Sequence, residues 1–82
     1  MIDVLYFAWL RERIGAPKEQ VETKATTVAE LVEELKTRSD AHALAFSDMA
    51  SVRVALDQEL TEMSAPLDGA REVAFFPPMT GG

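Results

Sequence analysis

The chain lacks cysteine entirely, and this absence excludes disulfides, thiolate metal sites and a cysteine nucleophile. It has a single histidine, so no pair of histidines can hold a metal. Basic residues are also scarce, because eight Lys and Arg stand against fourteen Asp and Glu, for a net charge of −6. An acidic surface repels phosphate groups, and we therefore expect neither nucleic acid nor an anionic membrane as a partner.

Long apolar runs are missing as well. None approaches the roughly 20 residues that a membrane span needs, and the opening Met1-Ile2-Asp3-Val4 lacks the basic flank and apolar core of a signal peptide. At 82 residues, 48% hydrophobic and 27% charged, the chain has the composition of a globular protein and the length for one core. We expect one small cytoplasmic domain without a linker.

The first part of the chain predicts two strands. Residues 2–10 are almost continuously apolar, which is typical of a strand covered on both faces. Alternation gives a core row and a second row that meets solvent or a partner; the rows are Ile2, Val4, Tyr6 and Ala8, then Asp3, Leu5, Phe7 and Trp9. Gly15 and Pro17 end this strand. Residues 18–24 predict an edge strand.

A capped helix follows. Thr27-Val28-Ala29-Glu30 fits a capping box, in which the Thr and Glu side chains satisfy free backbone amides at a helix start. Apolar residues recur at helical spacing after it and predict a helix over 28–38. Residues 40–47 predict a shorter helical turn.

The last third of the chain returns to strands. Residues 51–56 predict one strand, 57–58 a tight turn, and 59–62 its short partner. A turn signal at 66–69 precedes the last strand, 72–76. A helix between two strand pairs predicts an α+β fold, in which one mixed sheet carries the main helix on a single face.

Catalytic signals are weak along the chain. His42 is most simply a surface residue on the short helix. The carboxylates Glu30, Glu33 and Glu34 follow helical spacing, which is typical of a solvated helix face. The four glycines form no loop of the kind that cradles a phosphate.

The end of the chain is its unusual part: Phe75-Phe76-Pro77-Pro78-Met79-Thr80-Gly81-Gly82. Two prolines end the strand and hold the next residues extended, so the tail can reach about 20 Å beyond Phe76. Without side chains, Gly81 and Gly82 could thread a narrow channel and present a bare carboxylate. The competing interpretation is an ordinary frayed terminus.

A second feature points in the same direction. Phe7 lies in the outer row of the first strand, and Phe76 has the matching parity in the last strand. If these strands are neighbours, both rings share the sheet face away from the helix, together with Leu60. Such a face is a candidate partner surface, and the alternative is a second small core closed by loops.

These residues carry a resemblance to a known family. The opening Val4-Leu5-Tyr6-Phe7-Ala8, followed by Arg11-Glu12, and the ending from Glu72 to Gly82 resemble the small subunits of molybdopterin synthase. The length and the capped helix agree with this family over the whole chain. One departure is Ala70-Arg71, where the family often has Gly-Asp, and it bears on the turn before the last strand.

The resemblance implies a ubiquitin-like β-grasp domain over 1–76 and an extended Gly-Gly tail over 77–82. It implies a sulfur carrier that binds no cofactor itself. An adenylating, E1-like enzyme would use ATP and magnesium to activate the carboxylate of Gly82, and a donor such as a persulfide sulfurtransferase would convert it to a thiocarboxylate.

The resemblance also implies a partner and an assembly. The large subunit of the synthase would receive the tail, from Pro77 and Pro78 through Met79, Thr80 and Gly81, and sulfur would pass to cyclic pyranopterin monophosphate to build the dithiolene of molybdopterin. Two small and two large subunits would assemble. The implied docking residues are Phe7, Arg11, Leu60 and Phe76. The chain would be a co-substrate and subunit of a sulfurtransferase, with no catalysis of its own.

Other functions share much of this pattern. A sulfur carrier for thiamine synthesis or tRNA thiolation, or a ubiquitin-like modifier, would have the same fold and terminal glycines, whereas the Phe-Phe-Pro-Pro approach favours molybdopterin synthase. A plain β-grasp binding module with an inert end is the alternative of a different class.

Overall fold

The structure is a computed structural model of the chain, and it describes residues 1–78. Strands and short helices alternate along it. In chain order they are β1 (Ile2–Tyr6), α1 (Trp9–Ile14), β2 (Lys18–Val21), α2 (Val28–Lys36), α3 (Asp40–Ala45), the 3-10 turn η1 (Met49–Ser51), β3 (Arg53–Leu56), β4 (Glu59–Thr61) and β5 (Glu72–Phe76).

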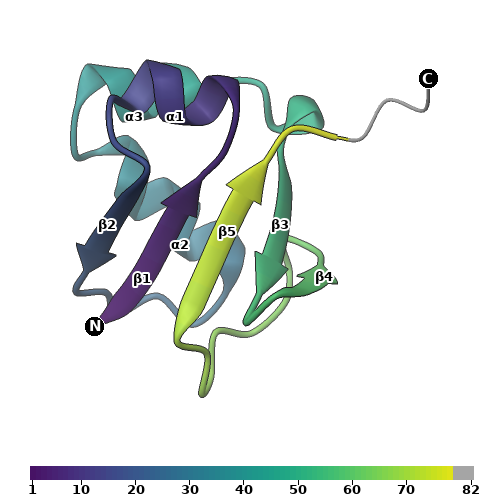
Figure 1. Cartoon of the computed structure of the whole chain (residues 1–82). Helices are drawn as coiled ribbons and strands as arrows, with labels where there is room; N and C mark the ends of the chain where they lie inside the picture. Colours follow the sequence, from purple (N-terminus) through teal and green to yellow (C-terminus); the bar gives the residue numbers. More distant parts are fainter. Residues whose placement is uncertain (79–82) are drawn as a thin grey trace.

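The strands form one mixed sheet in the order β2-β1-β5-β3-β4. The first and last strands, β1 and β5, are parallel neighbours in its middle, and the other pairs are antiparallel. The helices lie on one side of the sheet, with α1 and α3 together near the end where β1 finishes (Figure 1). The predicted α+β arrangement, a mixed sheet with its main helix on one face, is confirmed.

The core lies between the sheet and the helices. Alternate residues of β1 and β5 point into it, among them Val4, Tyr6, Val73 and Phe75, which are all fully buried or nearly so. The apolar stripe of α2 covers them with Val28, Leu31, Val32 and Leu35. This burial provides the main driving force for folding, and it leaves the opposite sheet face uncovered by any helix of the described chain (Figure 1).

The predicted first strand is wrong beyond its fifth residue. Strand β1 ends at Tyr6, and Ala8 then adopts a φ of +53°, which turns the chain into α1. Leu10, in this helix, becomes fully buried, while Ala8 of the predicted core row is exposed. Trp9 is half-buried beneath the guanidinium of Arg13. The unbroken apolar run hid a switch from strand to helix.

Other predicted boundaries shift by a few residues. Strand β2 stops at Val21, helix α2 at Lys36 and β4 at Thr61, while β3 begins only at Arg53 because η1 occupies the residues before it. Strand β5 has the predicted bounds. The tight turn at 57–58 is confirmed, since both of its residues have positive φ, as a turn matched to the twist of a hairpin requires.

The N-cap of α2 gives a direct test of the predicted helix start. The Thr27 side chain accepts a hydrogen bond of 3.2 Å from the backbone N–H of Glu30, as the capping box predicts. We expect Thr27→Ala to lower the free energy of unfolding by about 1 kcal/mol, measured by urea denaturation. Thr27→Ser keeps the acceptor and should stay close to the wild type; equal losses in both variants would contradict the capping role.

Candidate functional site

The outward side chains of the central strands form an apolar groove of about 650 Å³. Strand pairing builds it, because Leu5 of β1 lies beside Ala74 of β5, and Ala74 lies beside Ala55 of β3. The residues lining it are Leu5, Phe7, Gln58, Glu72, Ala74, Phe76 and Pro77. We call this groove, with its neighbour Leu60 on β4, the apolar sheet face.

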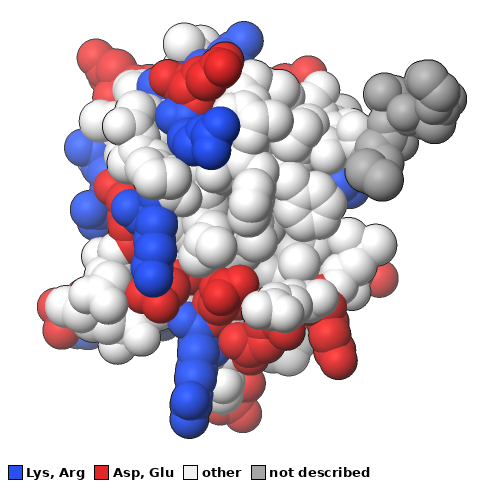
Figure 2. Space-filling view, in the orientation of Figure 1, with Lys and Arg blue, Asp and Glu red and all other residues white. Residues whose placement is uncertain are grey.

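The structure brings together three of the predicted docking residues. Phe7 and Phe76 line the same groove, and Leu60 lies beside Ala55 in the same row of the sheet. Phe7 is 44% exposed and Leu60 74% exposed, so within residues 1–78 this face is open to solvent and no loop closes it into a second core. Figure 2 shows it as a broad uncharged area over β1 and β5.

Arg11, the fourth predicted docking residue, is placed differently. It lies on α1, is exposed, and is not among the residues that line the groove. Sequence reasoning also missed several members of the groove. Leu5 was already expected in the outer row of the first strand, whereas Ala74 and Glu72 were not singled out; both share the outward parity of Phe76, and this parity was the available signal.

The tail begins at the groove. Pro77 follows the last residue of β5 and lines the groove, and Pro78 is half-buried. Because β5 is central and parallel to β1, the chain leaves the sheet beside Phe7. The other predicted tail residues, Met79, Thr80, Gly81 and Gly82, lie outside the described residues.

His42 is not the surface residue that the sequence indicated. It is only 7% exposed, and its ring lies 2.8 Å from Glu19 Oε2 through Nε2 and 2.7 Å from Ser39 Oγ through Nδ1. The Tyr6 hydroxyl donates to the same Glu19 oxygen at 2.7 Å, and Arg38 lies 3.7 Å from Oε1. The cluster joins β1, β2 and α3, segments whose contact no local pattern predicts.

Glu19 is the centre of this cluster. Burial by itself would raise the pKa of its carboxyl, but the hydrogen bonds from His42 and Tyr6 and the charges of His42 and Arg38 outweigh burial and hold that pKa below its usual 4.5. Burial and the adjacent carboxylate raise the pKa of Tyr6, which therefore remains a donor. No buried side-chain nitrogen or oxygen within residues 1–78, those of this cluster included, lacks a hydrogen-bond partner, as expected of a structural contact between sheet and helix.

The carboxylates of helix α2 contact residues close to them in the sequence or on the adjoining loop. Glu30 accepts bonds from the backbone and side chain of Thr26, and the backbone bond in particular lowers its pKa. Glu33 is exposed and pairs with Lys36 at 3.0 Å, while Glu34 is half-buried against Thr23. The prediction of a solvated helix face is thus confirmed for Glu30 and Glu33. In residues 1–78, no three acidic or histidine side chains converge as metal ligands.

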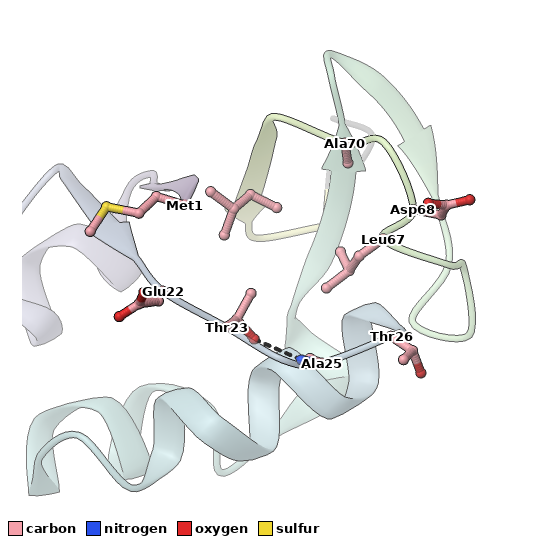
Figure 3. A pocket seen from close by; sticks show the side chains of 9 residues that line it. Met1, Glu22, Thr23, Ala25, Thr26, Leu67, Asp68 and Ala70 are labelled. Carbon is pink, nitrogen blue, oxygen red and sulfur yellow. Dashed lines mark hydrogen bonds between the residues drawn. The ribbon is translucent and has the colours of Figure 1, made fainter.

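A second hollow, of about 620 Å³, lies at the other end of the sheet, where β1 begins (Figure 3). Glu22 and Asp68 approach it from opposite sides and point away from each other, and Thr23 turns back to accept a bond from the Ala25 amide. Its polar groups therefore do not converge on a ligand. The hollow is also remote from the end of β5, from which the tail leaves.

Comparison with known proteins agrees with this geometry. The model of the ThiS family matches residues 4–82, nearly the whole chain. The chain belongs to the ThiS family. It is 42% identical to the molybdopterin synthase sulfur carrier subunit of Escherichia coli and 38% identical to that of Haemophilus influenzae, and each alignment covers all of both chains.

Solved structures show the fold. SAMP1 from Haloferax volcanii superimposes with a TM-score of 0.74 at 23% identity, over 99% of this chain and 98% of that one. A Pyrococcus furiosus protein assigned as molybdopterin converting factor, subunit 1, gives 0.75 at 27% identity, over 95% and 97%. This ThiS-family chain therefore has the expected ubiquitin-like β-grasp fold. No helix within residues 1–78 is long and apolar enough to cross a membrane.

The buried cluster predicts how stability depends on pH. Because the folded state lowers the pKa of Glu19, its contribution is complete above the unfolded pKa and disappears as the pH falls through the folded one. We expect Glu19→Gln to lower the free energy of unfolding by about 1–3 kcal/mol at pH 7, and the gap to the wild type to be smaller at an acidic pH below the usual 4.5 of this carboxyl. Urea unfolding at both pH values measures this, and a gap independent of pH would contradict the role of the charge.

Proposed function

We propose that this chain is the sulfur carrier subunit of a molybdopterin synthase, with the carboxylate of Gly82 as its reactive group. The observation that carries the proposal is the continuity between the apolar sheet face and the tail: Pro77 belongs to both. A partner that covers Phe7 and Phe76 is thereby aligned to receive the residues beyond Pro78. The end-to-end identity with sulfur carrier subunits of this synthase supports the same function.

The proposed chemistry begins with the carboxylate, which is a poor electrophile. An adenylating enzyme transfers AMP from ATP to Gly82, with magnesium on the phosphates, and pyrophosphate leaves. A persulfide from a sulfurtransferase displaces AMP, and a thiol then cleaves the resulting acyl disulfide to leave the thiocarboxylate. This sequence explains how a chain without cysteine carries sulfur.

Sulfur transfer takes place on the large subunit in this proposal. The thiocarboxylate sulfur attacks a carbon of cyclic pyranopterin monophosphate, and the carbon–oxygen bond at that position breaks. Water then cleaves the acyl–sulfur bond, so that the sulfur stays on the pterin and the carboxylate of the carrier returns. Two such transfers complete the dithiolene, in an assembly of two small and two large subunits. Within residues 1–78 the half-buried Glu19 and the buried His42 contact each other, and the groove itself carries only one ionisable side chain, Glu72. The groups that assist the reaction therefore come from the large subunit.

A sulfur carrier for thiamine synthesis or tRNA thiolation, or a ubiquitin-like modifier, is the second candidate. The shared fold and the Gly-Gly end favour it, whereas the full-length identity favours molybdopterin synthase. The need for ATP places either carrier in the cytoplasm, and the charge of −6 opposes nucleic acid or an anionic membrane as a partner. An inert binding module would not need Gly82 at all.

The carrier chemistry is tested by the intact mass of the protein. After incubation with host extract, ATP and a sulfur source, we expect the mass to rise by the difference between sulfur and oxygen. A variant without Gly82 should fold equally well and show no shift, because its activated carbon is absent from the required position. If the wild type remains unchanged in an extract that activates other carriers, the carrier function is wrong.

Docking is tested at Phe76. We expect Phe76→Asp to weaken binding to the large subunit by about a hundredfold or more, because it places a charge at the centre of the contact. Its half-exposed position should keep the stability loss near 1 kcal/mol or less, roughly the cost of a surface change.

Leu44→Asp is the matched control, since Leu44 is an exposed apolar residue on α3, away from the groove. It should bind like the wild type in calorimetry. A large loss of thermal stability in Phe76→Asp would instead assign Phe76 to core packing. Equal weakening of binding in both variants would show a general effect of the added charge.

A further inference from the structure

Glu72 is the one ionisable side chain among the described residues that line the groove, and Gln58 is the one other polar side chain there. It stands at the start of β5, on the same outward parity as Ala74 and Phe76. Its backbone is engaged on both sides: the amide donates to Asp57 Oδ1 and the carbonyl accepts from the Asp57 amide. Its carboxylate, in contrast, makes no hydrogen bond and no ion pair with any residue of 1–78.

A neighbouring carboxylate makes the unpaired charge of Glu72 still less favourable. Asp3 lies directly opposite Glu72 on the neighbouring strand β1, and like charges opposite each other in a sheet repel. Asp3 has Lys18 as a partner at 3.6 Å, whereas Glu72 has no cation within the described chain. Figure 2 shows acidic side chains, with basic ones beside them, along the lower border of the uncharged area.

A protein that covers the groove must compensate the negative charge of Glu72. Burying an unpaired carboxylate against apolar surface is strongly unfavourable, because the charge loses its hydration. An entirely apolar partner surface would therefore lose much of the affinity it gains from covering Phe7 and Phe76. A lysine or arginine beside the partner's apolar anchor removes that cost. It also adds attraction toward a chain whose net charge is −6.

We propose that Glu72 is the charged specificity contact of the apolar sheet face and pairs with a lysine or arginine of the protein that docks there. This inference rests on the proposed function, which supplies that protein: the large subunit of the synthase. Apolar anchors then provide the area of contact, and Glu72 sets its register and excludes partners that present an acidic or apolar surface at this position.

The test compares Glu72→Gln with the wild type in titrations of the purified large subunit. We expect binding to weaken about tenfold or more. The salt dependence of the affinity should also become shallower, because one ion pair is gone. Thermal stability should not fall, since the carboxylate has no partner to lose within residues 1–78.

Glu33→Gln is the matched control, because it removes the same charge from α2, on the far side of the sheet. It should bind like the wild type. Equal affinity and equal salt slope for Glu72→Gln and the wild type would overturn the role of Glu72 while leaving the proposed function intact.

Two further outcomes separate the two claims. Failure of the wild type itself to bind the large subunit would overturn the proposed function, and the inference with it. Self-association of the free protein that is lost in Glu72→Gln, seen by sedimentation, would make a second copy of this chain the occupant and overturn the assignment to the large subunit.

Discussion

The parallel pairing of β1 with β5 is the constraint on which the rest of the structure depends. It joins the first strand of the chain to the last in the middle of the sheet. On the inner side it stacks the rings of Tyr6 and Phe75, with centroids 6.4 Å apart and planes 17° from parallel. On the outer side the same register brings Phe7 beside Phe76. One set of backbone hydrogen bonds thus positions both the core and the candidate docking surface.

This arrangement separates stability from recognition. Inner residues of the two strands are buried by the helices, so changes there act on folding. Outer residues such as Phe7 and Leu60 are exposed on the apolar sheet face, so changes there act mainly on binding. A short strand with two apolar faces looks uniform in sequence, yet one face stabilises the core and the other is available for binding. The alternation of residues along the strand decides on which face each side chain lies.

The sequence was sufficient for the elements that local rules determine. The capping box fixed the start of α2, and the apolar strand with its two prolines fixed the bounds of β5. It was insufficient where tertiary contacts decide. Leu10 is apolar in a strand or in a helix, and only the turn at Ala8 assigns it to α1. His42 becomes buried because Glu19, distant in sequence, meets it across the fold.

The candidate site follows the same division. The sequence already indicated that Phe7, Leu60 and Phe76 share a face, but the position of Glu72 in the groove, opposite Asp3, required the sheet order and register. The described lining of the groove holds one ionisable side chain, Glu72, and no pair of acid and base, so in our proposal the reactive group is the terminal carboxylate and not a side chain of the groove. A carrier that meets several proteins in turn benefits from this, because a reactive group on the domain itself would act at every encounter, whereas a carboxylate reacts only where it is activated.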